Sequence, residues 1–76
     1  MTKISYKIDR KSLCALLVQA REAANLTQKQ VADIGIVSQS EISKIENGQR
    51  KVEHVVLLKL AELYGKNINF FIPKKK

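Results

Sequence analysis

A run of polar side chains between residues 38 and 47 has the composition and spacing to form hydrogen bonds along one face of a helix. At about 100° per residue, these amide, hydroxyl and amine groups fall on one side, and Ile42 and Ile45 fall on the other. The polar side comprises Gln39, Ser40, Ser43, Lys44 and Asn47. Such groups can bond to base edges in a major groove that is wide enough for a helix. The same face would also suit plain contact with water, so the pattern alone leaves both interpretations open.

The net charge of the chain favours an acidic partner. Lys and Arg number 14 and Asp and Glu number 7, which leaves a formal charge of +7 in 76 residues. Three of the cations are consecutive, in residues 74–76. A positive field concentrates phosphate groups near the protein surface, so nucleic acid is the leading candidate for the partner. At this length, the chain has room for one small domain.

The scarcity of reactive residue types argues against an enzyme, a metal site and a disulfide. Cys14 and His54 are the sole cysteine and histidine in the sequence, so an internal disulfide is impossible and a zinc site lacks ligands. The sequence contains no glycine-rich phosphate loop and no paired nucleophile and base. The first residues are too polar for a signal peptide, and no apolar run approaches about 18 residues. We therefore expect a cytoplasmic, non-enzymatic protein with no cofactor, no metal ion and no membrane segment.

The hydropathy pattern predicts a compact all-α domain preceded by a short extended arm. Residues 3–8 alternate polar and apolar side chains, which is typical of a strand or an extended arm, so residues 1–8 are predicted as an arm and residues 73–76 as a basic flexible tail. The domain occupies residues 9–72. Its helices, with their caps, are predicted at residues 9–24, 27–34, 38–47 and 53–64, with one further turn that begins at Asn67 or Asn69.

Capping residues mark the ends of these helices. Thr27 with Gln30 three positions later forms a capping box at the start of the second helix, and Ser38 caps the third. Asn25 suits the left-handed conformation that ends the first helix. A capped helix, a short turn and a second capped helix together make a helix-turn-helix arrangement. This context favours base reading over simple solvation for the polar face.

The segment LTQKQVADIGIVSQSEISKIENGQRK resembles the core of the lambda Cro and repressor type of helix-turn-helix domain, also called the xenobiotic response element family. The residues that stand in register with the family pattern are Arg21, Leu26, Thr27, Gln28, Val31, Ala32, Val37, Ser38, Ile42, Ser43, Ile45, Glu46 and Gly48. The resemblance implies five helices and a homodimer on a palindromic double-stranded DNA operator. It also implies transcription regulation, expected as a repressor.

The resemblance assigns roles to single residues. The positions that match base-reading sites, or lie between them, are Gln39, Ser40, Ser43 and Lys44. The positions that match phosphate-binding sites are Gln28, Asn47, Arg50 and Lys51. Arg21 and Glu46 match a pair that ties the first helix to the end of the third, so their expected role is structural.

Two features depart from the family pattern. Gly35 stands where a larger apolar residue is usual, and Ile36 stands where the family has a glycine. Because a positive φ strains a β-branched residue, the second helix is expected to stop at Gly35, with Ile34 or Ile36 turning into the core. Glu41 lies on the flank of the third helix. It is expected to be solvated and to repel phosphate rather than to accept a bond from cytosine.

The last helix has more apolar surface than one core requires. Val56 and Leu63 lie roughly 100° to 120° from the centre of its inward stripe. The phenylalanines that follow could cover them within the chain, or the same residues of a second subunit could do so. The family precedent favours the dimer, with an interface predicted at Val56, Leu63, Phe70 and Phe71. The alternative function is an antitoxin-like module that covers a toxin-like protein partner and binds its own promoter.

Overall fold

The computed structural model describes residues 10–71, and every regular element in that range is helical. The elements are α1 (Arg10–Ala23), α2 (Gln28–Ile34), α3 (Gln39–Glu46), α4 (His54–Tyr64) and the 3₁₀ turn η1 (Ile68–Phe70). The all-α class is confirmed. The prediction of five helices is not, because the described range has four α-helices and only the short turn η1 follows them. The predicted arm (1–8), residue 9 at the start of the predicted first helix, and the predicted tail (73–76) lie outside the described residues.

α1 forms because its apolar residues recur at helical spacing. Leu13, Leu17 and Ala20 face inward, with 8%, 1% and 0% of their surface exposed. The helix ends at Ala23, and Asn25 follows with a left-handed φ of 60°. Asn tolerates this conformation better than most other non-glycine residues. The predicted end of the first helix is therefore correct to within one residue.

Both helices of the helix-turn-helix begin with a complete capping box. At α2 the Gln30 N–H donates to Thr27 Oγ1 over 3.0 Å, and the Thr27 N–H donates to Gln30 Oε1 over 2.8 Å. At α3 the Glu41 N–H donates to Ser38 Oγ over 3.1 Å, and the Ser38 N–H donates to Glu41 Oε1 over 2.9 Å. Each box satisfies backbone N–H groups that have no partner within the helix. Local sequence therefore sets the start of both helices.

The turn between α2 and α3 starts at Gly35. This residue has a φ of 99°, and its N–H donates to the Ala32 carbonyl over 3.0 Å. α2 therefore stops at Ile34, as predicted, and glycine occupies the position of positive φ. Ile36 packs partly buried against the core, whereas Ile34 is 51% exposed. Of the two residues considered for filling the core, Ile36 is the one that does so.

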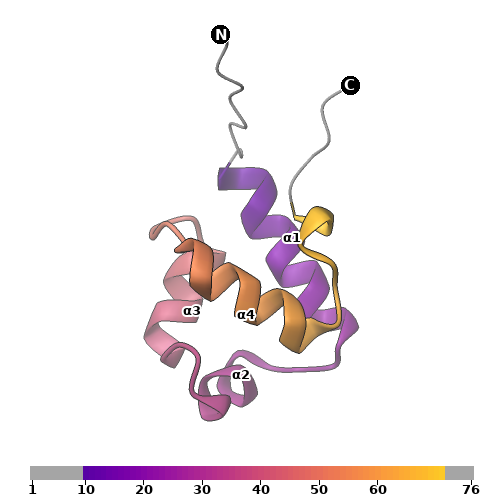
Figure 1. Ribbon diagram of the computed structural model, residues 1–76. Coiled ribbons are helices and arrows are strands. Elements are labelled where there is room, and N and C mark those ends of the chain that lie inside the picture. The colour runs from indigo at the N-terminus through magenta and orange to yellow at the C-terminus, as the bar shows by residue number, and fades with distance from the viewer. Residues whose placement is uncertain (1–9, 72–76) are drawn as a thin grey trace, which may run out of the picture.

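α4 packs against α1 and closes the core (Figure 1). Its inward residues are Leu57, Leu60, Ala61 and Tyr64. α3 packs against both α1 and α2, and the buried residues form one cluster. No helix among residues 10–71 is long and apolar enough to cross a membrane.

The segment after α4 folds back onto the chain's own core. Gly65 ends α4 with a φ of 73°, and the Asn69 N–H donates to Asn67 Oδ1 over 2.9 Å at the start of η1. The rings of Phe70 and Phe71 meet edge to face, with centroids 5.0 Å apart. Phe71 has 0% exposure, so it offers no surface to a second subunit. This corrects the assignment of Phe71 to a dimer interface.

Candidate nucleic-acid interface

α3 separates an apolar face from a polar face. Ile42 and Ile45 are 0% and 4% exposed, and they hold the helix on the core. The residues predicted to read bases are Gln39, Ser40 and Lys44, which are exposed, and Ser43, which is half-buried. The structure therefore brings these residues onto one accessible side of one helix.

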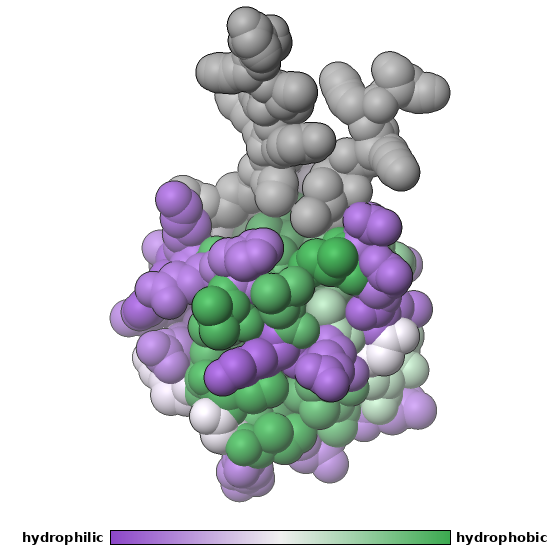
Figure 2. Space-filling view, viewed as in Figure 1, coloured by the Kyte–Doolittle hydropathy of each residue, from purple (hydrophilic) through white to green (hydrophobic). Residues whose placement is uncertain are grey.

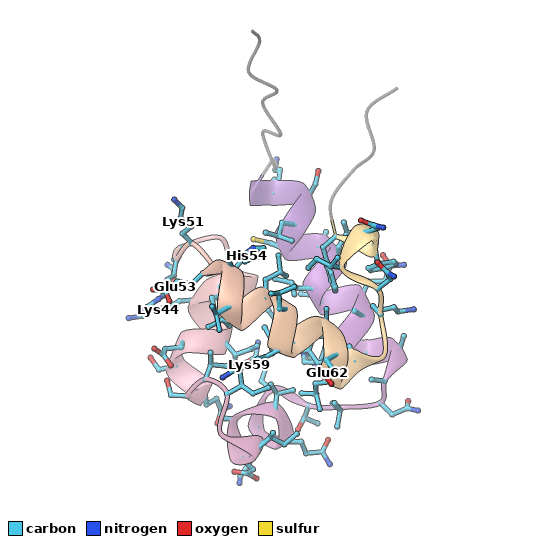
Figure 3. The ribbon with its side chains drawn as sticks, in the orientation of Figure 1. Lys44, Lys51, Glu53, His54, Lys59 and Glu62 are labelled. Atoms are coloured by element: carbon cyan, nitrogen blue, oxygen red, sulfur yellow. The ribbon has the colours of Figure 1, made fainter. Side chains whose placement is uncertain are left out.

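The turn after α3 places two exposed cations beside this face. Asn47 caps the end of α3. The N–H groups of Gln49 and Arg50 both donate to the Lys44 carbonyl, over 2.8 and 3.2 Å, so the chain folds back on the last turn of α3. Arg50 and Lys51 are exposed. Figure 3 shows Lys44 and Lys51 on the same edge of the molecule, with the carboxylate of Glu53 between them, so the two cations from α3 and from the turn share this edge with one acidic residue.

A network of partly buried charges joins the first three helices. Arg21 and Glu46 form a bidentate ion pair, with Nε to Oε2 at 2.9 Å and Nη2 to Oε1 at 3.2 Å. Arg21 Nη1 also donates to the Leu26 carbonyl over 2.8 Å. The two charged side chains are 12% and 4% exposed, so water and salt screen the pair weakly. The hydrogen bond to Glu46 raises the pKa of Arg21. The expected pair is therefore present, and it ties α1 to the end of α3.

Gln28 belongs to the same network, which the sequence did not reveal. Its Nε2 donates to Glu46 Oε1 over 2.9 Å, and the residue is half-buried. Glu46 therefore accepts hydrogen bonds from both α1 and α2. One N–H of the Gln28 amide is engaged by Glu46, so a phosphate contact from this side chain stays a prediction that the second N–H of Nε2 must carry.

Glu41 has a structural role that was not predicted. Besides its capping box with Ser38, its Oε2 lies 3.7 Å from Arg50 Nη2. Hydrogen bonds from the backbone and side chain of Ser38 lower the pKa of Glu41, and the nearby charge of Arg50 acts in the same direction. The signal for the cap, a serine followed three residues later by a glutamate, was present in the sequence.

In the described part of the chain, the large apolar residues that are exposed differ from those that the sequence predicted to form surplus apolar surface. Val55 and Leu58 on α4 are 58% and 42% exposed, and Ile34 is also exposed. Val56 and Leu63 are instead partly buried and pack against the core. Figure 2 shows apolar side chains on the face where α4 lies, bounded and partly divided by hydrophilic ones. An apolar patch is therefore available on this face.

Comparison with protein-family models matches residues 17–71 to the family described as Helix-turn-helix. The matched range contains the polar face of α3, the turn after it and the network around Glu46. Comparison with curated proteins gives no match. The family match covers well over half of the chain and agrees with the observed order of helices. The chain therefore belongs to the helix-turn-helix family of the Cro and repressor type, a family of DNA-binding domains of transcription regulators.

Proposed function

We propose that the protein is a cytoplasmic, sequence-specific transcriptional repressor that inserts α3 into the major groove of double-stranded DNA. The observation that carries this proposal is the exposed polar face of α3, which Ile42 and Ile45 fix from the opposite side. The exposed cations Arg50 and Lys51 flank that face. A helix fits the major groove, and amide and amine groups on it can distinguish base pairs. A protein bound at a promoter in this way blocks access of the transcription machinery.

Each side chain on the polar face suits a particular kind of base edge. Gln39 lies at the first position of α3 and can bond to adenine N6 and N7. Lys44 can donate to guanine O6 and N7, and the Ser40 hydroxyl can bond to several bases. Ser43 is half-buried in the middle of the face, so its hydroxyl can bond only to a base edge that lies close to α3. We therefore assign base discrimination to α3.

Phosphate contacts are proposed for residues around α3. Asn47 and Lys51 are exposed, and Arg50 is exposed but partly neutralised by Glu41 at 3.7 Å. Lys51 therefore offers phosphate a positive charge that is less neutralised by neighbouring carboxylates than the charge of Arg50. Gln28 stays in this group through the second N–H of its side-chain amide, which Glu46 does not engage. Contacts of this kind hold a protein on any DNA sequence and weaken as the salt concentration rises.

We further propose that the active form is a homodimer on a palindromic operator. Val55 and Leu58 lie about one turn apart on the exposed side of α4, at helical spacing from Lys59 and Glu62 (Figure 3). A two-fold interface uses the same patch on both subunits, and burial of these side chains adds stability that a small domain lacks. The other residues predicted for the interface that keep partial exposure are Val56, Leu63 and Phe70.

Selection of bound sequences from a random pool of double-stranded DNA tests this function. We expect the enriched sites to contain two inverted half-sites whose centres lie about one helical turn, or ~34 Å, apart. Enrichment of single half-sites would contradict the dimer, and the absence of any enriched sequence would contradict base reading. A toxin-like protein that co-purifies one to one and covers Val55 and Leu58 would instead support the antitoxin-like alternative.

A further inference from the structure

An apolar pocket with a cationic mouth lies between α1 and the turn that follows α3. Its volume is about 270 Å³, near the lower end of the range for small-molecule sites. Its floor consists of Leu13, Cys14, Leu17 and Ile45. Its mouth consists of Arg50, Lys51 and Val52. The floor takes no part in the proposed DNA contacts, so the pocket has no assigned occupant.

The floor of the pocket offers a ligand an apolar surface. Leu17 and Ile45 are 1% and 4% exposed and close the floor against the core, so the apolar surface open to a ligand lies on Leu13, 8% exposed, and on the half-buried Val52. The Cys14 thiol donates to the Ile45 carbonyl over 3.1 Å, so its hydrogen is already engaged within the protein. A hydrocarbon chain suits such a surface, because its burial removes apolar area from water and leaves no polar atom unpaired.

The mouth of the pocket carries positive charge that is only partly neutralised. Lys51 is exposed and makes no ion pair with another residue in the range 10–71, and Arg50 approaches Glu41 at 3.7 Å. Figure 3 places Lys51 on the loop that joins α3 to α4. Lys and Arg can lay their aliphatic stems along apolar surface while the charged group stays in water. The mouth therefore suits a carboxylate whose hydrocarbon chain enters the pocket.

We propose that this pocket binds a free amphipathic carboxylate of small size, such as a medium-chain fatty acid. Its hydrocarbon chain lies between the open edge of Leu13 and the half-buried Val52, and its carboxylate meets Lys51 and Arg50. The apolar floor and the cationic mouth select for the two ends of the same molecule. A cationic amphiphile of equal length meets like charge at the mouth and is rejected.

The pocket shares Arg50 and Lys51 with the turn proposed to bind phosphate, and the regulatory consequence rests on that proposed function. A bound carboxylate neutralises the two cations and draws them toward the pocket. The ligand therefore lowers the affinity for DNA while leaving unchanged the bases that α3 prefers. The protein would release its operator when the carboxylate accumulates.

Binding is tested with the full chain and free decanoate below its micelle concentration, by calorimetry and by amide chemical shifts. We expect saturable one-to-one binding, with the largest shifts around Cys14 and Val52. From hexanoate upward, affinity should rise about fourfold per added methylene until the pocket is full. Decyltrimethylammonium, matched in chain length, should not compete. Equal binding of both amphiphiles, or binding to anionic phospholipid vesicles without binding of free decanoate, would overturn the proposal.

Two variants and one control variant locate the site. Lys51→Ala should weaken decanoate binding about threefold, whereas Lys59→Ala, a matched control on α4, should leave it unchanged. Val52→Phe should fill the pocket and abolish decanoate binding, with helical content unchanged by circular dichroism. If Val52→Phe fails to fold, the two lysine variants decide the matter. An equal effect of Lys51→Ala and Lys59→Ala would overturn the proposal.

A DNA-binding measurement separates this proposal from the proposed function. Decanoate should weaken operator binding by the unmodified protein and leave Val52→Phe unaffected, with the same preferred sequence in both. If decanoate binds in the pocket and the protein binds no DNA, the proposed function fails and the ligand site stands. If the protein binds DNA specifically and decanoate does not bind, the ligand site alone is overturned.

Discussion

Glu46 shows how one side chain determines the geometry of the interface. It accepts hydrogen bonds from Arg21 on α1 and from Gln28 on α2, and it stands at the last position of α3. Its side chain is 4% exposed, so water cannot replace a lost partner. Together with the apolar packing of Ile42 and Ile45, this carboxylate therefore fixes the orientation of the reading helix relative to α1 and α2.

Glu46→Ala should lower the free energy of unfolding by about 3 kcal/mol, because Arg21 and Gln28 lose their acceptor in a partly buried site. Urea denaturation of Glu46→Ala, Arg21→Ala and the double variant measures the coupling energy. The pair Lys29 and Asp33, at 3.4 Å with side chains 73% and 65% exposed, is the matched control. Its coupling should stay below about 0.5 kcal/mol. A coupling that small between Arg21 and Glu46 would contradict their structural role.

Tyr64 should make the fold less stable at high pH. Its hydroxyl is buried without a hydrogen-bond partner in the described range, and burial, with the charge of Glu46, raises the pKa of Tyr64 to about 12. An unfolded tyrosine titrates near pH ~10, so between about pH 10 and 12 the unfolded chain releases a proton that the folded chain keeps. The free energy of unfolding therefore falls as pH rises, by about 1 kcal/mol at pH ~11.

Chemical denaturation across this pH range, for the unmodified chain and for Tyr64→Phe, measures the effect. In Tyr64→Phe the free energy of unfolding should fall less with rising pH than in the unmodified chain, because phenylalanine has no proton to release. Identical profiles for the two proteins would show that the Tyr64 hydroxyl is not shielded from water.

Among the secondary-structure elements, helix ends could be predicted and contacts between helices could not. The glycine stop at Gly35 and the capping box of Ser38 and Glu41 each depend on neighbours within a few residues. The Ser38 half of that box was recognised from the sequence, while Glu41 was assigned to solvent although its spacing fits the motif. Gln28 and Glu46 are 18 positions apart and meet only after α2 and α3 pack, so no local pattern indicates their contact.

Ser38→Ala should destabilise the protein by about 1 kcal/mol, because the Glu41 N–H at the start of α3 loses its acceptor. Glu41→Gln keeps an oxygen that can accept from the Ser38 N–H, so it should cost less than Glu41→Ala. Thermal unfolding of the three variants near neutral pH measures both effects. Equal losses for Gln and Ala at position 41 would contradict the second half of the capping box.

The same cap predicts a loss of stability in acid. Hydrogen bonds from Ser38 lower the pKa of Glu41, so its carboxylate adds stability above its unfolded-state pKa. That contribution is lost as pH falls through the lowered pKa of the folded state. Glu41→Gln cannot be protonated in this range, so it should lose less stability than the unmodified chain on acidification.

At the scale of the whole molecule, the exposed side of α4 is where prediction and structure differ most. Most residues of this helix are apolar, so helical periodicity alone did not define an outer face. Val56 and Leu63 were assigned to the surface, whereas Val55 and Leu58 are the residues that lie there. α1, which is distant in the sequence, packs against α4, and η1 packs against it after the chain turns back at Gly65. Tertiary packing therefore decides which apolar residues are available to a second subunit.

Leu58→Asp should abolish dimer formation without unfolding the domain, because Leu58 is already 42% exposed in the single chain. Affinity for the full palindrome should then fall toward the affinity for one half-site. Analytical ultracentrifugation on and off DNA, with circular dichroism for the fold, measures both effects. Phe71→Asp is the opposite control and should unfold the domain, since that side chain is fully buried. A dimer that persists in Leu58→Asp would place the interface elsewhere.

The most direct test of base reading by α3 is the affinity of alanine variants for the selected operator and for each of its single-base variants. Gln39→Ala and Lys44→Ala should each lose about 1 to 3 kcal/mol of discrimination at particular base pairs. Lys51→Ala should weaken binding to all sequences about equally and reduce the slope of log affinity against log salt by about one. If Lys51→Ala changed the preferred bases, or if Gln39→Ala and Lys44→Ala lowered affinity uniformly, the assignment of α3 as the reading helix would be contradicted.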